Sequence, residues 1–109
     1  MSESFSFVAN LAEHLQIPEA GILSVTLHES DACRIVLFGF GAGQEMSWHT
    51  ATDPATIQLV SGRATWSLGT ERLEAAPGSW AYMAAHLPHA IAAHEPSVML
   101  LVLHRTRTT

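Results

Sequence analysis

Two histidines, His49 and His89, hold the most evident chemical potential in this sequence. His49 stands inside a strand-like run, and His89 closes a turn and opens a second strand-like run. Imidazole is the commonest metal ligand among side chains, and it also exchanges hydrogen bonds with water and with organic ligands. The segments around both residues predict β-structure that would hold the two rings in one cavity.

The number of available ligands limits what such a pair can do. A structural zinc site uses four protein ligands, a catalytic zinc site uses three, and a non-haem iron centre uses two histidines and a carboxylate. Two residues nearby are candidates for a third ligand: Glu45 shares strand parity with His49 if no bulge intervenes, and His86 lies three residues before His89. Without a third group, two neutral imidazoles would bond to each other, to water or to an organic ligand.

Length and composition place these residues in a small globular protein. The 109 residues predict a single domain, and 48% of them are hydrophobic. The net charge is -5 and the chain has no lysine, which argues against a nucleic-acid or anionic-membrane partner. Cys33 is the only cysteine, so an internal disulfide is excluded. The acidic N-terminus does not resemble a signal peptide, and no run approaches the ~20 apolar residues of a membrane helix, so we expect a cytoplasmic protein.

Most of the chain carries strand signals. Short runs rich in β-branched and aromatic residues alternate with turn residues, which predicts roughly nine or ten strands in a small sandwich or barrel. The expected strands span residues 22–27, 32–40, a run around 49, 55–61, 64–68, 71–75, 80–83, 89–93 and 98–103.

Residues 1–20 differ from the rest of the sequence. Phe7, Val8, Leu11 and Leu15 fall at helical spacing, and Pro18 ends that pattern. The spacing predicts one short helix packed on the outside, or an arm that reaches a neighbouring subunit.

The glycines and histidines also follow a recognisable frame. Gly43 is followed by five residues and then His49, and Gly62 closes this first stretch. A second stretch opens at Pro77-Gly78 and ends in the turn 84–89. This frame resembles the two signature motifs of the cupins, and the resemblance covers about residues 35 to 103. It implies an all-β, cupin-like double-stranded β-helix (a jelly-roll barrel) over residues 21–109, with residues 1–20 as an N-terminal helix or arm.

The chain departs from the cupin pattern at the ligand positions. In metal-binding cupins the first motif supplies three ligands and the second supplies a histidine. His49 and His89 match two of these positions, whereas Ala51 and Ala55 stand at the other two. Asp53 lies near the vacant glutamate position but two residues early. The resemblance therefore implies a divalent metal (zinc, nickel, iron or manganese) held weakly by His49 and His89, with His86 and Glu45 as further candidates.

Two hypotheses about function follow. The first is a protein that binds a small molecule in the barrel cavity, together with a weakly held divalent metal. The second is a metal-dependent cupin enzyme of the oxygenase or isomerase type with a two-histidine site. The missing carboxylate at position 55 favours the first hypothesis.

A homodimer is the expected assembly. Barrels of this kind leave sheet edges and apolar faces that a two-fold partner can cover. Trp48 follows Ser47 and precedes His49, so on a regular strand it points away from the cavity. Trp48 is therefore a candidate subunit contact.

Overall fold

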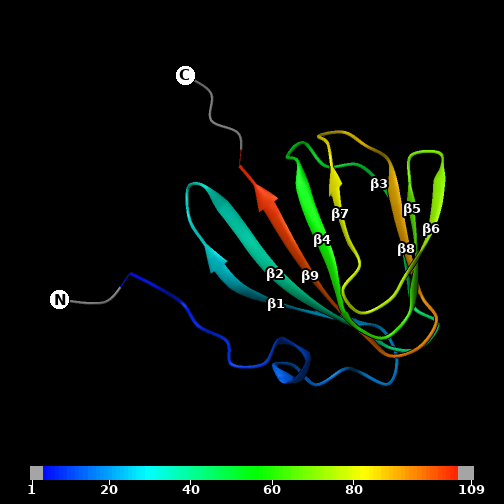
Figure 1. Cartoon of the computed structure of the whole chain (residues 1–109), viewed down its shortest axis with the longest axis horizontal. Coiled ribbons are helices and arrows are strands. Elements are labelled where there is room, and N and C mark those ends of the chain that lie inside the picture. The colour runs from blue at the N-terminus through cyan, green and yellow to red at the C-terminus, as the bar shows by residue number, and fades with distance from the viewer. Residues whose placement is uncertain (1–3, 106–109) are drawn as a thin grey trace.

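Nine β-strands dominate the computed structural model of this chain, which describes residues 4–105 (Figure 1). Five of the expected strands are confirmed with unchanged bounds, because turn residues flank each of them closely. In chain order the strands are β1 (Ile22–Glu29), β2 (Cys33–Phe40), β3 (Glu45–His49), β4 (Ala55–Ser61), β5 (Ala64–Leu68), β6 (Glu71–Ala75), β7 (Trp80–Met83), β8 (His89–Ala93) and β9 (Ser97–His104).

The strands form two antiparallel sheets. The five-stranded sheet has the order β1-β2-β9-β4-β7, and the four-stranded sheet has the order β3-β8-β5-β6. Figure 1 shows β4, β9 and β7 on one side and β3, β8, β5 and β6 on the other, so the two sheets form the walls of a jelly-roll barrel. The predicted all-β jelly-roll architecture is confirmed.

The core lies between the sheets. Along β8 the buried residues His89, Ile91 and Ala93 alternate with the more exposed Ala90 and Ala92, as expected for a strand with one face toward the core. Other inward side chains complete one apolar cluster, whose buried members are Phe40, Ala55, Ile57, Leu59, Ala64, Trp66, Ala75, Met83, Ile91, Ala93 and Met99.

The sequence left a short helix or an arm open for residues 1–20. Among the described residues 4–20, the helical part is a single 3-10 turn (η1) at Leu11–Glu13, capped by the side chain of Asn10. The segment instead lies along the sheet, and a Cβ at Gly39 would stand 2.4 Å from Cδ1 of Leu15. Gly39 thus lets Leu15 pack closely on β2, and this tertiary contact prevails over a weak local helical preference.

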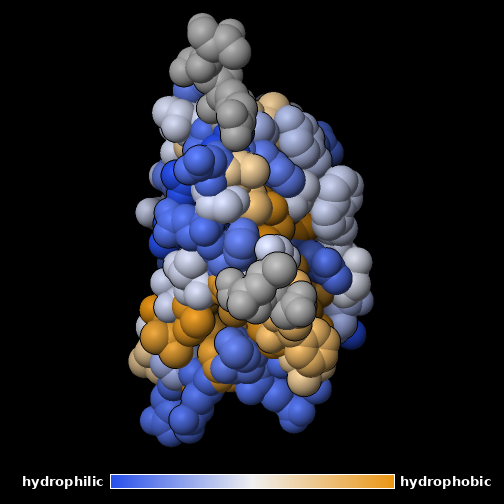
Figure 2. All heavy atoms as spheres, turned by 90° about the vertical axis from the view of Figure 1, so that its left-hand side faces the viewer, coloured by the Kyte–Doolittle hydropathy of each residue, from blue (hydrophilic) through white to orange (hydrophobic). Residues whose placement is uncertain are grey.

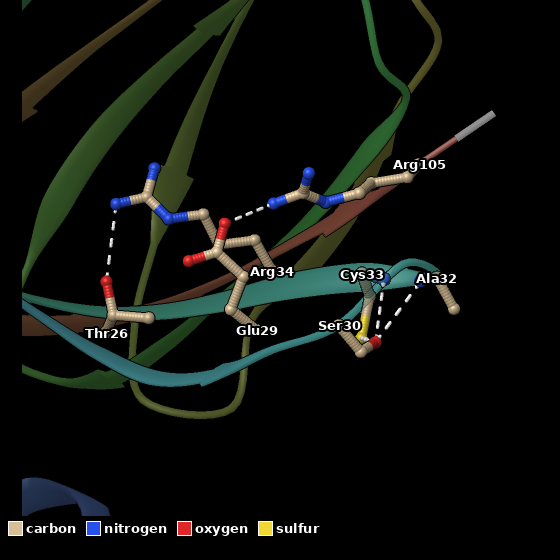
Figure 3. A network of polar contacts seen from close by, with 7 residues as sticks. All are labelled: Thr26, Glu29, Ser30, Ala32, Cys33, Arg34 and Arg105. Atoms are coloured by element: carbon tan, nitrogen blue, oxygen red, sulfur yellow. Dashed lines mark hydrogen bonds and ion pairs between the residues drawn. The ribbon is translucent and has the colours of Figure 1, made fainter.

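A polar network holds the turn end of the β1–β2 hairpin (Figure 3). The hydroxyl of Ser30 accepts hydrogen bonds from the backbone N–H groups of Ala32 and Cys33 at 3.2 and 3.4 Å. Glu29 forms an ion pair with Arg105, which follows β9. These contacts fasten the edge strand β1 to the centre of its sheet.

Two sequence expectations reach the limits of the described residues. The regions 1–20 and 21–109 both extend beyond residues 4–105, so their outer ends lie outside what the structure describes. Within residues 4–105, no helix has the length and apolar character needed to span a membrane.

Candidate functional site

The two histidines lie side by side on the four-stranded sheet. His49 ends β3, His89 begins β8, and the two residues are register partners. Their ring centroids are 4.1 Å apart with an interplanar angle of 62°. His89 is 7% exposed, whereas His49 is open to solvent at the rim. The antiparallel register therefore turns two residues forty positions apart in the sequence into one pair.

Each imidazole is oriented by its own strand end. Nδ1 of His49 lies 2.8 Å from the carbonyl oxygen of Ser47, and Nδ1 of His89 lies 2.8 Å from the carbonyl oxygen of Leu87. Since a carbonyl oxygen only accepts hydrogen bonds, both Nδ1 atoms donate. In the neutral ring the lone pair then resides on Nε2, which is the tautomer that metal-binding and hydrogen-bond-accepting histidines use.

A cavity of about 170 Å³ opens beside this pair. Both histidines line it, and Asp53 is the one other ionisable residue on its wall among the described residues. The remaining wall is apolar and comes from both sheets: Phe38, Met46, Ala51, Ala55, Ile57, Met83, Ala84, Ile91, Met99, Leu101 and Leu103. The cavity thus has an imidazole end and a hydrocarbon interior.

A β-bulge decides which residues share the cavity with His49. Met46 pairs with Ile91 and His49 pairs with His89. Between these two pairs β3 contains one more residue than β8, which is a β-bulge. The bulge brings Met46 to the face of His49 and leaves Glu45 on the other face. Glu45 lines a hollow on the outside of the sheet together with Ser47. The sequence placed Glu45 on the face of His49 only if no bulge intervened; the bulge is present, and Glu45 lies on the other face.

The other sequence candidates have separate positions. His86 is exposed, and its φ of 69° marks a tight turn in which its backbone N–H donates to the carbonyl of Ala51 at 2.7 Å. It is absent from the cavity wall, whereas Asp53 lies on it. Trp48 is 57% exposed and lines the outer hollow, as its position next to His49 predicted.

Comparisons with known proteins show which solved structures share this fold. No protein-family model matches the sequence, and no curated protein matches it. Solved structures do match. A conserved protein of unknown function from Streptococcus pyogenes is 29% identical with a TM-score of 0.85, over 97% of this chain and 93% of that one. A cupin superfamily protein from Desulfitobacterium hafniense is 25% identical with a TM-score of 0.80, over 84% of each chain.

An RmlC-like cupin from Shewanella frigidimarina is 19% identical with a TM-score of 0.79, over 97% of this chain and 94% of that one. This chain is a cupin by fold. In the cupin frame, Ala51 and Ala55 occupy ligand positions, and both line the cavity beside the two histidines. Within residues 4–105 no three histidine, cysteine, aspartate or glutamate side chains are grouped to hold a metal ion. The donor set of this cupin therefore fits a firmly held divalent ion poorly.

Sequence reasoning missed the methionines of this cupin. Met46, Met83 and Met99 all line the cavity. Met46 lies three residues before His49, and on a regular strand that odd spacing would put the two on opposite faces. Only knowledge of the bulge in β3 would have placed Met46 on the cavity side.

Proposed function

We propose that this cupin binds a compact, largely apolar molecule in its barrel cavity through His49 and His89. The observation that carries the proposal is the pair of oriented imidazoles at one end of a largely apolar cavity. A pocket with an apolar lining and a few fixed polar groups is typical of small-molecule sites.

The cavity constrains the class of ligand. A cavity of about 150 Å³ accommodates benzene, so a volume of about 170 Å³ suits a body the size of one small ring. Both Nδ1–H groups already donate to backbone carbonyls, which leaves the Nε2 lone pairs to accept. The complementary ligand carries one hydrogen-bond donor, such as a hydroxyl group, on a small hydrocarbon ring.

Binding of phenol and anisole would test this function. Phenol is expected to bind about 2- to 13-fold more tightly than anisole, because its hydroxyl donates to an imidazole and one net hydrogen bond contributes about 0.5–1.5 kcal/mol. The preference should disappear in the His49→Ala/His89→Ala double variant. Isothermal titration calorimetry measures all four affinities.

The control variant is His94→Ala. His94 lies on the outer face, where Nε2 is 2.6 Å from the hydroxyl of Thr65, so its loss should leave the preference for phenol unchanged. Equal affinities of the native protein for phenol and anisole would contradict the proposal. So would a preference that survives the loss of both cavity histidines.

Metal binding and the cellular location are also proposals. A divalent ion (zinc, nickel, iron or manganese) would have His49 and His89 as its protein ligands, with other positions left to solvent or to the bound molecule, and so would be held weakly. A cytoplasmic location is a prediction of the sequence.

We also propose that the N-terminal arm, residues 4–10, docks on a second copy of this chain. The side chains of Phe5 and Phe7 are 73% and 79% exposed. In Figure 1 this arm runs away from the barrel, and Figure 2 shows apolar side chains gathered over the lower half of the face from which it leaves. An aromatic pair that leaves its own barrel is best covered by another chain, and a two-fold dimer gives both arms the same contact.

The area involved fits a dimer. Each phenylalanine can bury about 150–250 Å², so four from two arms supply about 600–1,000 Å² of the ~1,600 Å² of a standard interface. Trp80 and Tyr82 on β7 are 62% and 56% exposed and offer further apolar area on an outer sheet face.

Oligomeric state provides the test. The Phe5→Ser/Phe7→Ser variant is expected to elute as a monomer at concentrations where the native protein is a dimer, as measured by size-exclusion chromatography with light scattering. Leu73→Ser is the control, since Leu73 is a 43% exposed apolar residue on β6, outside the arm. A native protein that is monomeric, or a double variant that remains dimeric, would exclude this interface.

A further inference from the structure

The thioethers of the cavity suggest a different kind of metal from the divalent ions that the cupin frame implies. Met46, Met83 and Met99 share the cavity wall with His49 and His89. Thioether sulfur is a soft donor, and soft donors select Cu(I) over the harder divalent ions. Ala51 and Ala55 remove the side chains that would have favoured those harder ions.

Met83 belongs to the same end of the barrel as the histidine pair. Two loops close this end: residues 50–54 lead from His49 to β4, and residues 84–88 lead from Met83 to His89. A hydrogen bond from the backbone N–H of His86 to the carbonyl of Ala51 joins the two loops. Met83 and the two histidines therefore lie at the same end of the barrel, beside these two loops.

The two sheets aim these side chains at one another. Met83 ends β7 in the five-stranded sheet, where it pairs with Ala55, whereas His49 and His89 belong to the four-stranded sheet. Packed sheets are about 10 Å apart, so inward side chains from both walls meet in the middle. Met83 is 3% exposed and lines the cavity.

Met46 is the nearest inward-facing residue to the pair on β3. It pairs with Ile91, two residues along β8 from His89, and the bulge brings it to the cavity face. Met99 is more distant. It lies four residues before Leu103 on β9, and Leu103 shares a rung with Ala55 and Met83, so Met99 is about 13 Å further along the strand.

We propose that this cavity binds a single cuprous ion through Nε2 of His49, Nε2 of His89 and the sulfur of Met83, with the sulfur of Met46 as a fourth donor. The Nδ1–H bonds to backbone carbonyls hold both rings in the ligating tautomer and raise the basicity of Nε2. The inference concerns the same cavity as the proposed function, but it does not require an organic ligand.

An anaerobic competition titration of Cu(I) between the protein and bicinchoninate tests this site. One equivalent of Cu(I) is expected to leave the coloured chelate for the native protein. Loss of a group that merely orients a ligand weakens metal binding about 10–100-fold, so loss of a ligand itself in Met83→Leu or His49→Ala should weaken it at least about tenfold. Methionine and leucine are similar in volume, so Met83→Leu retains the packing.

Met99→Leu is the matched control, and its Cu(I) affinity should stay within about twofold of the native value, since its sulfur is remote from the histidine end. As a second readout, Ag(I) should shift the methyl resonances of Met83 and Met46 in a ¹H–¹³C spectrum and leave that of Met99 in place. Absence of Cu(I) transfer to the native protein, or equal losses in Met83→Leu and Met99→Leu, would overturn the proposal. The phenol titration is performed without metal, so failure of one proposal is distinguishable from failure of the other.

Discussion

Replacement of Gly62 by alanine is expected to lower the free energy of unfolding by about 3 kcal/mol or more. Gly62 connects β4 to β5 with a φ of +94°. A Cβ there would stand 2.1 Å from Oγ of Ser97, 2.6 Å from the carbonyl oxygen of Pro96 and 2.7 Å from Cα of Ser97. The positive φ strains any L side chain, and the backbone atoms of the β8–β9 turn cannot move aside cheaply.

The residues around Gly62 cannot easily move to make room for an added Cβ. Ser97 is fully buried, and its hydroxyl donates to the carbonyl of Glu95 at 2.8 Å. A shift of Ser97 would break this hydrogen bond and leave buried polar atoms unpaired, which costs about 1–3 kcal/mol. Urea unfolding followed by circular dichroism measures the difference.

Gly78→Ala separates the two causes. Gly78 has a similar φ of +98°, but a Cβ there would meet no atom within 4 Å. We expect this variant to lose about 1–2 kcal/mol from backbone strain alone. Equal losses in Gly62→Ala and Gly78→Ala would contradict the close contact between the two turns.

The double variant Ala51→His/Ala55→Glu is expected to acquire firm binding of zinc. Both alanines line the cavity beside His49 and His89, so the substitutions would raise the donor set from two groups to four. At a zinc concentration of 100 times the dissociation constant, binding should stabilise the variant by about 2.7 kcal/mol. The native protein should respond far less. Thermal unfolding with and without zinc measures both shifts.

The metal-free double variant supplies a second expectation. Ala55 is 3% exposed, so a glutamate at this position would bury a carboxylate without a partner, and the variant should unfold below the native temperature. Zinc should reverse that loss, and it should fail to do so when His89→Ala is added. Identical zinc responses in the native and double variants would contradict the inferred position of the two alanines.

The strands of this protein were largely predictable. Gly69-Thr70 separates β5 from β6, and Pro77-Gly78 precedes β7, so turn chemistry marks these strand ends in the sequence itself. The fold class followed from the number of such strands and from the frame of Gly43, His49 and Gly62. Local rules succeed here because strand ends depend mainly on the residues next to them.

The candidate site was only partly predictable. His49 and His89 could be chosen from their residue type and their place in the frame, and both line the cavity. Glu45 would share the face of His49 only on a regular strand, and the bulge in β3 places it on the other face, because strand parity holds only until an extra residue is inserted. Between the helix and the arm that the sequence left open for residues 1–20, local spacing could not choose: the helical part of residues 4–20 is Leu11–Glu13 alone, and Leu15 packs closely on Gly39.

The sequence by itself determined the strand order along the chain, the two histidines and the loss of ligands at Ala51 and Ala55. Tertiary structure alone decided that His49 and His89 are register partners, that Met46 joins them and that Met83 approaches from the opposite sheet. The physical reason is that strand pairing and bulges are set by contacts between residues distant in the sequence, and these contacts carry no local signal. The chemistry of the cavity therefore depends on one extra residue in β3.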